Sequence, residues 1–217
     1  MKNLILIGLV AGLSFASTAS ALTTTVTFTD GPGSTGGGEF NAVTSGHGSF
    51  VTFCLEYQEH IAFGTTFYYE VSQTARYNGN GTLDPLSRAT AWLYLQFRSG
   101  TLGSYGALYD YTGTTSDAND LQRAIWYLEG ETAGASSPNY YATLALNNAV
   151  SANEDNNGFY GVGVMNLWGN DAGTLARQDQ LILIPSGGST VPDGGATVAL
   201  LGMGLGLIAF GSRRWNR

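Results

Sequence analysis

Apolar and polar residues alternate with a period of two in three stretches near the start of the chain, at 22–29, 50–57 and 65–72. Successive side chains of an extended chain point to opposite faces, and these stretches are rich in Val, Phe, Tyr and Thr, so we expect three strands. In the second strand, Cys54 and Glu56 fall on the same face. Between the first two strands we expect a glycine-rich loop over 31–38.

A helical period replaces this alternation in the middle of the chain. Apolar residues recur every three or four positions between capping residues and glycines, which predicts helices over 84–100, 116–130 and 137–150. Strand patterns return at 158–168 and 180–184. The order of strands, helices and strands indicates an α+β fold, a single domain of antiparallel β-strands with an inserted helical segment.

Composition narrows the class of protein further. The chain has 217 residues, of which 12% are charged and 12% are aromatic. Low charge with many aromatic residues argues against disorder, and the length fits one domain with appendages. Residues 22–190 contain five arginines, fifteen acids and no lysine, which is a net charge of −10. We therefore expect no nucleic-acid partner, because a phosphate backbone needs a basic surface.

The first 21 residues have the three parts of a secretory signal peptide in the right order. Lys2 supplies the positive start, residues 4–15 are apolar, and the small residues 19–21 (Ala-Ser-Ala) form a cleavage pattern. The alternative is a buried N-terminal helix. The signal-peptide interpretation predicts that the protein is exported, with cleavage after Ala21.

The other end of the chain has a short polar motif, an apolar run and an arginine cluster. The motif is Val191, Pro192, Asp193 and Gly194, and the apolar run covers 196–210. That run is shorter than the roughly 20 residues that span a bilayer comfortably. The arginines that follow it would stay cytoplasmic under the positive-inside rule. The alternative to a processed signal is an ordinary C-terminal transmembrane anchor.

This three-part order resembles the PEP-CTERM class of bacterial sorting signals, in a Val-Pro-Asp-Gly variant. The resemblance implies processing by an exosortase-type enzyme, with an inner-membrane intermediate held by the C-terminal helix. The product would then reside on the cell surface or in the extracellular matrix. We thus expect a signal peptide at 1–21, an exported domain at 22–190 and a sorting tail at 191–217.

Cys54 is the single cysteine of the chain. Exported proteins usually carry cysteines in disulfide pairs, and exposed free thiols are oxidised outside the cell. A lone cysteine in such a protein is therefore either buried and inert or committed to another bond. One cysteine and two histidines make no ligand cluster of the zinc type, so we expect no metal, and no cofactor motif is present.

Two short motifs bear on that choice. Phe53 precedes Cys54 on an expected strand, and Gln122 opens a Gln-Arg-Ala-Ile-Trp segment on the second expected helix. Together they resemble the thioester domains of bacterial surface adhesins, whose pattern is Thr-Gln-x-Ala-Ile-Trp; here Leu121 stands in place of the threonine. The resemblance implies an intramolecular thioester between Cys54 and Gln122.

Other residues would support such a bond. Phe53, Ile125 and Trp126 are placed to shield it from water, because a dry site protects a reactive intermediate. Glu56 shares a strand face with the cysteine and His60 is the nearer of the two histidines, so both are candidates for proton transfer. A plain surface role for His60 remains the alternative.

The function expected from these features is covalent attachment of a surface or matrix protein to an amine or hydroxyl of a polysaccharide or protein target. Such capture is a single turnover, so we do not expect an enzyme. The absence of lysine from 22–190 suits an amine-reactive protein, although compositional bias also explains it. The first alternative is a non-covalent structural or carbohydrate-binding matrix protein, in which Tyr109, Tyr111 or Tyr140 could stack on sugars. The second is a cysteine hydrolase with a histidine base.

Overall fold

The computed structural model of the chain describes residues 21–34, 37–76, 83–131 and 133–184. The described residues up to Ile182 form one compact unit. The expected signal peptide and the expected sorting tail lie outside the described residues, apart from Ala21. Within the described ranges, no helix combines the length and the apolar character needed to cross a membrane.

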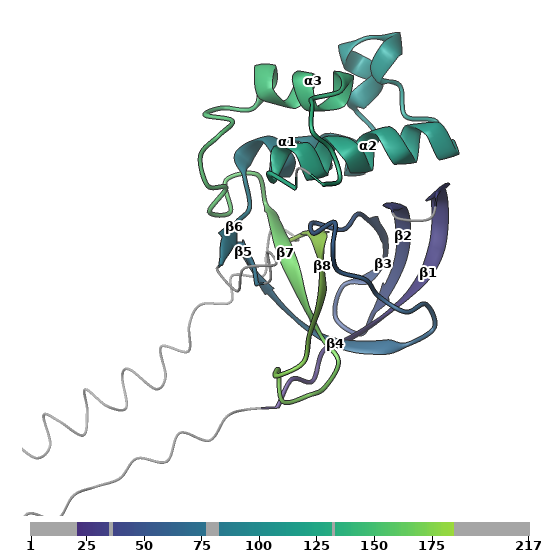
Figure 1. Cartoon of the computed structure of the whole chain (residues 1–217), viewed down its shortest axis with the longest axis vertical. Coiled ribbons are helices and arrows are strands. Elements are labelled where there is room, and N and C mark those ends of the chain that lie inside the picture. Colours follow the sequence, from purple (N-terminus) through teal and green to yellow (C-terminus); the bar gives the residue numbers. More distant parts are fainter. Residues whose placement is uncertain (1–20, 35–36, 77–82, 132, 185–217) are drawn as a thin grey trace, which may run out of the picture. The chain divides into compact units, whose positions relative to one another are not determined.

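A six-stranded sheet forms the base of this unit (Figure 1). Its strand order is β3-β2-β1-β4-β7-β8, and the pairs from β3 through to β7 are antiparallel. Two short strands, β5 and β6, form a separate ladder. The strands of the main sheet are β1 (Thr25–Ser34), β2 (Gly37–Thr44), β3 (Gly48–Thr52), β4 (Thr66–Ser72), β7 (Val162–Trp168) and β8 (Ala176–Leu183).

The inner face of this sheet carries the core. Val26 and Phe28 alternate inward from β1, and Phe67 and Tyr69 do so from β4. All four are at most 3% exposed. Period-two alternation in the sequence thus became burial of one face, as expected for an antiparallel sheet with one side on the core.

The chain just after β3 meets the opposite edge strand, so the curved sheet nearly closes on itself. Cys54 and Gln180 form an antiparallel bridge. On either side of that bridge, Leu55 donates to the Asp179 carbonyl at 3.0 Å and Leu181 donates to the Phe53 carbonyl at 3.1 Å. These bonds attach the segment that carries Cys54 to strand β8, although the two are about 125 residues apart in the chain.

Three helices, α1 (Arg88–Arg98), α2 (Thr115–Leu128) and α3 (Tyr140–Asn148), pack together over one end of the sheet (Figure 1). Side chains cap each N-terminus: Ser87 accepts from Thr90, Thr114 and Asp117 form a capping box, and Asn139 accepts from Ala142. Helix α2 packs against β1 and β2 through its buried stripe. Two 3₁₀ turns, η1 (Leu102–Tyr105) and η2 (Ala107–Tyr109), connect α1 to α2.

The observed elements agree with the α+β class predicted from the sequence, with some differences in detail. Strands at 22–29, 65–72 and 158–168 and all three helices are present. The loop predicted over 31–38 was wrong, because β1 continues to Ser34 and β2 begins at Gly37. The strand predicted over 50–57 was half right, because β3 ends at Thr52 and Cys54 contributes only its bridge. Helix α1 begins later than predicted, because the residues before it form the short strand β6 (Asp84–Pro85), which pairs with β5 (Thr74–Ala75).

Candidate functional site

The Cys54 thiol and the Gln122 side chain lie in contact, although 68 residues separate them in sequence. The distance between Cys54 Sγ and Gln122 Oε1 is 3.3 Å. Both residues are 1% exposed. The structure therefore brings together the two residues that the sequence motifs singled out.

The Gln122 carboxamide is also fixed to the backbone of Cys54 by two hydrogen bonds. The Cys54 N–H donates to Gln122 Oε1 at 3.2 Å, and Gln122 Nε2 donates to the Cys54 carbonyl at 2.8 Å. The side-chain amide thus pairs with Cys54 as a neighbouring strand would. Its oxygen and its nitrogen each make a hydrogen bond to the backbone of that residue. This reciprocal pairing sets the distance and orientation of the carboxamide relative to the sulfur.

Close packing holds Gln122 in that position. A Cβ built on Gly37 would lie 2.8 Å from Gln122 Cγ and 2.4 Å from the Trp126 ring. Only glycine fits there, because carbon atoms in contact normally stay about 3.5–4.0 Å apart. Trp126 in turn packs edge-on against Tyr57, with ring centroids 4.9 Å apart, and against the backbone of Gly134.

The three predicted shielding residues are all buried, but they do different things. Trp126 is 5% exposed and lies at the site, next to Gly37. Phe53 is fully buried and packs edge-on against Phe97 at 5.1 Å, so it supports the strand that carries the cysteine. Ile125 is also fully buried, as part of the apolar stripe of α2.

Burial keeps the thiol neutral. It raises the pKa of Cys54 well above its ordinary value, and the nearby charge of Glu56 adds to this effect. The Trp126 indole N–H makes no hydrogen bond within the described part of the chain; its proximity favours the thiolate and so partly lowers the pKa of Cys54. The Cys54 sulfur therefore stays protonated at rest, and a base must take its proton when the sulfur reacts.

Glu56, the first predicted proton-transfer residue, is buried beside the cysteine. It is 3% exposed, and its Oε2 accepts from the Asp179 N–H at 2.8 Å. Burial, followed by the charge of Asp179, raises the pKa of Glu56 well above the usual range. Its second oxygen has no partner among the described residues. Glu56 is thus a buried carboxyl that holds its proton more tightly than usual, which makes it a candidate for proton exchange.

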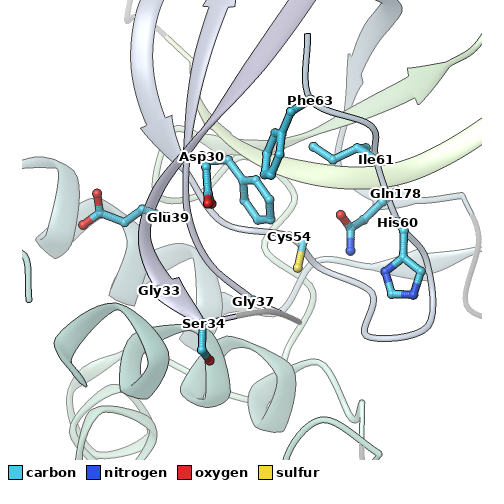
Figure 2. Close-up of a pocket in the computed structure, with 11 residues that line it drawn as sticks. Asp30, Gly33, Ser34, Gly37, Glu39, Cys54, His60, Ile61, Phe63 and Gln178 are labelled. Atoms are coloured by element: carbon cyan, nitrogen blue, oxygen red, sulfur yellow. The ribbon is translucent and has the colours of Figure 1, made fainter. Parts of the chain in front are cut away.

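Two cavities flank the cysteine–glutamine pair. The larger, of about 410 Å³, opens on the cysteine, and we call it the sulfur cavity (Figure 2). Its walls include His60, the second proton-transfer candidate, which is exposed. The other groups that give this cavity its character are two acids, an amide and aromatic rings: Asp30, Glu39, Gln178, Phe40 and Phe63.

The smaller cavity, of about 190 Å³, opens on Gln122 and not on Cys54, and we call it the glutamine cavity. The two cavities share Ser34 and Gly37. The remaining walls of the glutamine cavity are Tyr57, Asn119, Arg123, Trp126 and Gly134.

Sequence reasoning missed the residues that shape these cavities. Asp30 and Glu39 come from the consecutive strands β1 and β2, whereas Gln178 comes from the distant strand β8, and no motif links them to the cysteine. Gly37 and Gly134 leave room for the Trp126 ring because they have no side chain.

The structure offers fewer of the features that sugar binding, a histidine base or a metal site would need. Tyr109, Tyr111 and Tyr140 are half-buried, and Tyr111 donates a hydrogen bond to Glu39. The His47 ring lies against Tyr69, with ring centroids 6.1 Å apart. Within the described ranges, no three His, Cys, Asp or Glu side chains gather closely enough to hold a metal ion.

Comparison with known proteins identifies only the C-terminal tail. A family model described as the VPDSG-CTERM motif matches residues 190–215, where this chain has Gly194 at the position of the serine. No curated protein and no solved structure matches the chain. The match supports a sorting signal of the PEP-CTERM type. The chain is accordingly an exported surface or extracellular protein that an exosortase-type enzyme processes.

Proposed function

We propose that the exported domain forms an internal thioester between Cys54 and Gln122 and uses it to attach the protein covalently to a target. The observation that carries this proposal is the double hydrogen bond between the Gln122 carboxamide and the Cys54 backbone, with the sulfur 3.3 Å from Oε1. An inert buried cysteine needs no such partner. A cysteine prepared to attack a carboxamide needs one held in this position.

The bond-forming step balances without any outside oxidant or reductant. The Cys54 sulfur bonds to the Gln122 side-chain carbonyl carbon, the C–N bond breaks, and ammonia leaves with the thiol proton. The Cys54 N–H already donates to Oε1, where negative charge develops during the attack. The Cys54 carbonyl holds the nitrogen that departs.

The environment supplies what a primary amide lacks as an electrophile. Holding the reacting groups in attack geometry can contribute roughly 7–11 kcal/mol to lowering a barrier. The raised pKa of Cys54 means that its proton must leave during the attack. Glu56 is the buried carboxyl near enough to influence the thiol, and it is our candidate for exchanging that proton with the departing nitrogen.

Burial also protects the product. Both partners are 1% exposed, and Trp126 covers the site at 5% exposure. A target amine or hydroxyl that reaches the Gln122 carbonyl carbon would displace the Cys54 sulfur from it. The Cys54 thiol would be released, and the target would stay bound to Gln122. This chemistry suits an exported protein, since the target then lies outside the cell.

Intact mass spectrometry of the mature domain tests the proposal. The mass should be lower than the sequence mass by one ammonia, and methylamine should then add its whole mass by opening the thioester. Cys54→Ala and Gln122→Ala should abolish both effects. Gln96→Ala, which alters a half-buried glutamine of α1, is the matched control and should leave both unchanged.

The cysteine variant also removes one ambiguity. Asn-Gly sequences such as 157–158 can lose ammonia by cyclising, and that loss would persist in Cys54→Ala. An unmodified mass, together with one thiol that titrates after unfolding, would refute the thioester. The non-covalent matrix protein would then be the better interpretation.

A further inference from the structure

The two cavities differ in which member of the pair they reach, and this difference bears on how a target could enter. The sulfur cavity is lined by Cys54 and not by Gln122, whereas the glutamine cavity is lined by Gln122 and not by Cys54. In a thioester the electrophilic carbon belongs to the glutamine, and the sulfur is the leaving group. A nucleophile must therefore reach the side of the pair that the glutamine occupies.

The edge of the carboxamide is closed to an incoming group. The Cys54 N–H donates to its oxygen, and in the thioester the Cys54 sulfur would stand on the carbonyl carbon in place of the departed nitrogen. A nucleophile attacks a carbonyl carbon from above or below the carbonyl plane, so it must arrive from a cavity beside that plane. The glutamine cavity is the space that borders Gln122.

We propose that the target group enters through the glutamine cavity and that this cavity selects a primary nucleophile on an unbranched carbon. This inference rests on the thioester proposed above. The cavity holds about 190 Å³, less than half the volume of the sulfur cavity. Tyr57 and Trp126 form rigid walls, since they pack edge-on at 4.9 Å. Its remaining room depends on Gly37 and Gly134, where any side chain would meet Trp126.

The polar lining suits the head of such a nucleophile. Ser34, Asn119 and Arg123 contribute hydrogen-bonding groups to the glutamine cavity. The Asn119 Oδ1 accepts from both the N–H and the hydroxyl of Ser34 at 3.0 Å, which fixes the position of both residues. Arg123 is exposed, and its closest carboxylate contact is Asp120 at 3.6 Å. Arg123 therefore stands at the solvent end of the cavity.

A pair of matched variants tests the route of entry. Arg123→Trp and Asp30→Trp each replace an exposed charged side chain by tryptophan, the first at the glutamine cavity and the second at the sulfur cavity. The rate at which methylamine adds to the preformed thioester is followed by intact mass. We expect Arg123→Trp to slow this addition about tenfold or more and Asp30→Trp to change it less than about twofold.

The readings separate the two proposals. The mass before methylamine is added reports whether the thioester exists. If the unaltered domain contains no thioester, the proposed function is refuted. With the thioester present, slowing by Asp30→Trp and not by Arg123→Trp would overturn the route of entry. Should Arg123→Trp fail to fold, Asn119→Phe fills the same cavity and carries the same expectation.

A series of amines on the unaltered domain gives an independent check. Methylamine and tert-butylamine are compared, each rate being divided by its rate with a small thioester in solution. Exclusion by the glutamine cavity predicts that tert-butylamine is at least about tenfold slower on this corrected scale. Equal corrected rates would contradict selection by the cavity.

Discussion

Replacing Gly37 by alanine perturbs the site while both reacting residues keep their identity. The new Cβ would lie 2.4 Å from the Trp126 ring and 2.8 Å from Gln122 Cγ. Carbon contacts settle at about 3.5–4.0 Å, so the indole, the glutamine or the β2 backbone must move by about 1 Å. Overpacking of this kind costs about 1–3 kcal/mol of folding stability.

The effect on thioester formation should be larger than the effect on folding. A displacement of about 1 Å at a reacting group can cost on the order of 100-fold in rate. We therefore expect a mature Gly37→Ala domain to remain folded but to contain little thioester. The assay is the fraction of chains that lack one ammonia at a fixed time after synthesis, measured alongside thermal unfolding.

Gly48→Ala is the matched control. Gly48 opens β3 at the turn end of the β2–β3 hairpin, away from Gly37; it has φ of +71°, and nothing lies within 4 Å of its Cβ position. Alanine there costs about 1–2 kcal/mol through backbone strain alone. Equal thioester fractions in Gly37→Ala and the unaltered domain would refute the argument that this close contact positions the glutamine.

Two further predictions concern protonation. Trp126→Phe removes the N–H that favours the thiolate, so the pKa of Cys54 should rise further and thioester should accumulate more slowly; an unchanged fraction by intact mass would count against this role. Burial raises the pKa of Glu129 to about 7, so this carboxyl contributes stability that is complete below pH 4 and is lost as the pH rises through 7. Glu129→Gln keeps an oxygen for the Ser87 hydroxyl and N–H, and it should reduce the loss of thermal stability between pH 5 and pH 8. A pH dependence identical to that of the unaltered domain would contradict this assignment.

Local sequence patterns predicted most of the elements. Alternation revealed β1 and β4, and the capping residues with helical spacing revealed all three helices. The glycine-rich start of β2 has a composition typical of loops, and only its pairing with β1 and β3 makes it a strand. Pairing between strands is a tertiary effect, so no short window of sequence contains it.

The candidate site divides in the same way. The motifs around Cys54 and Gln122 identified two residues that the fold brings into contact across 68 positions. The backbone pairing that orients the glutamine could not be read from the motifs, because it depends on where the helical layer sits on the sheet. Nor could the role of Gly37, which depends on the space beside Trp126.

The most direct measurement is peptide mapping of the mature domain under conditions that preserve thioesters. Because residues 22–190 contain no lysine, trypsin cleaves this region only after its arginines, which places Cys54 in peptide 22–76 and Gln122 in peptide 99–123. The account predicts one joined species whose mass is the sum of both peptides less one ammonia, and which separates when hydroxylamine is added. Recovery of the two peptides individually, with Cys54 as a free thiol and Gln122 as an intact amide, would contradict it.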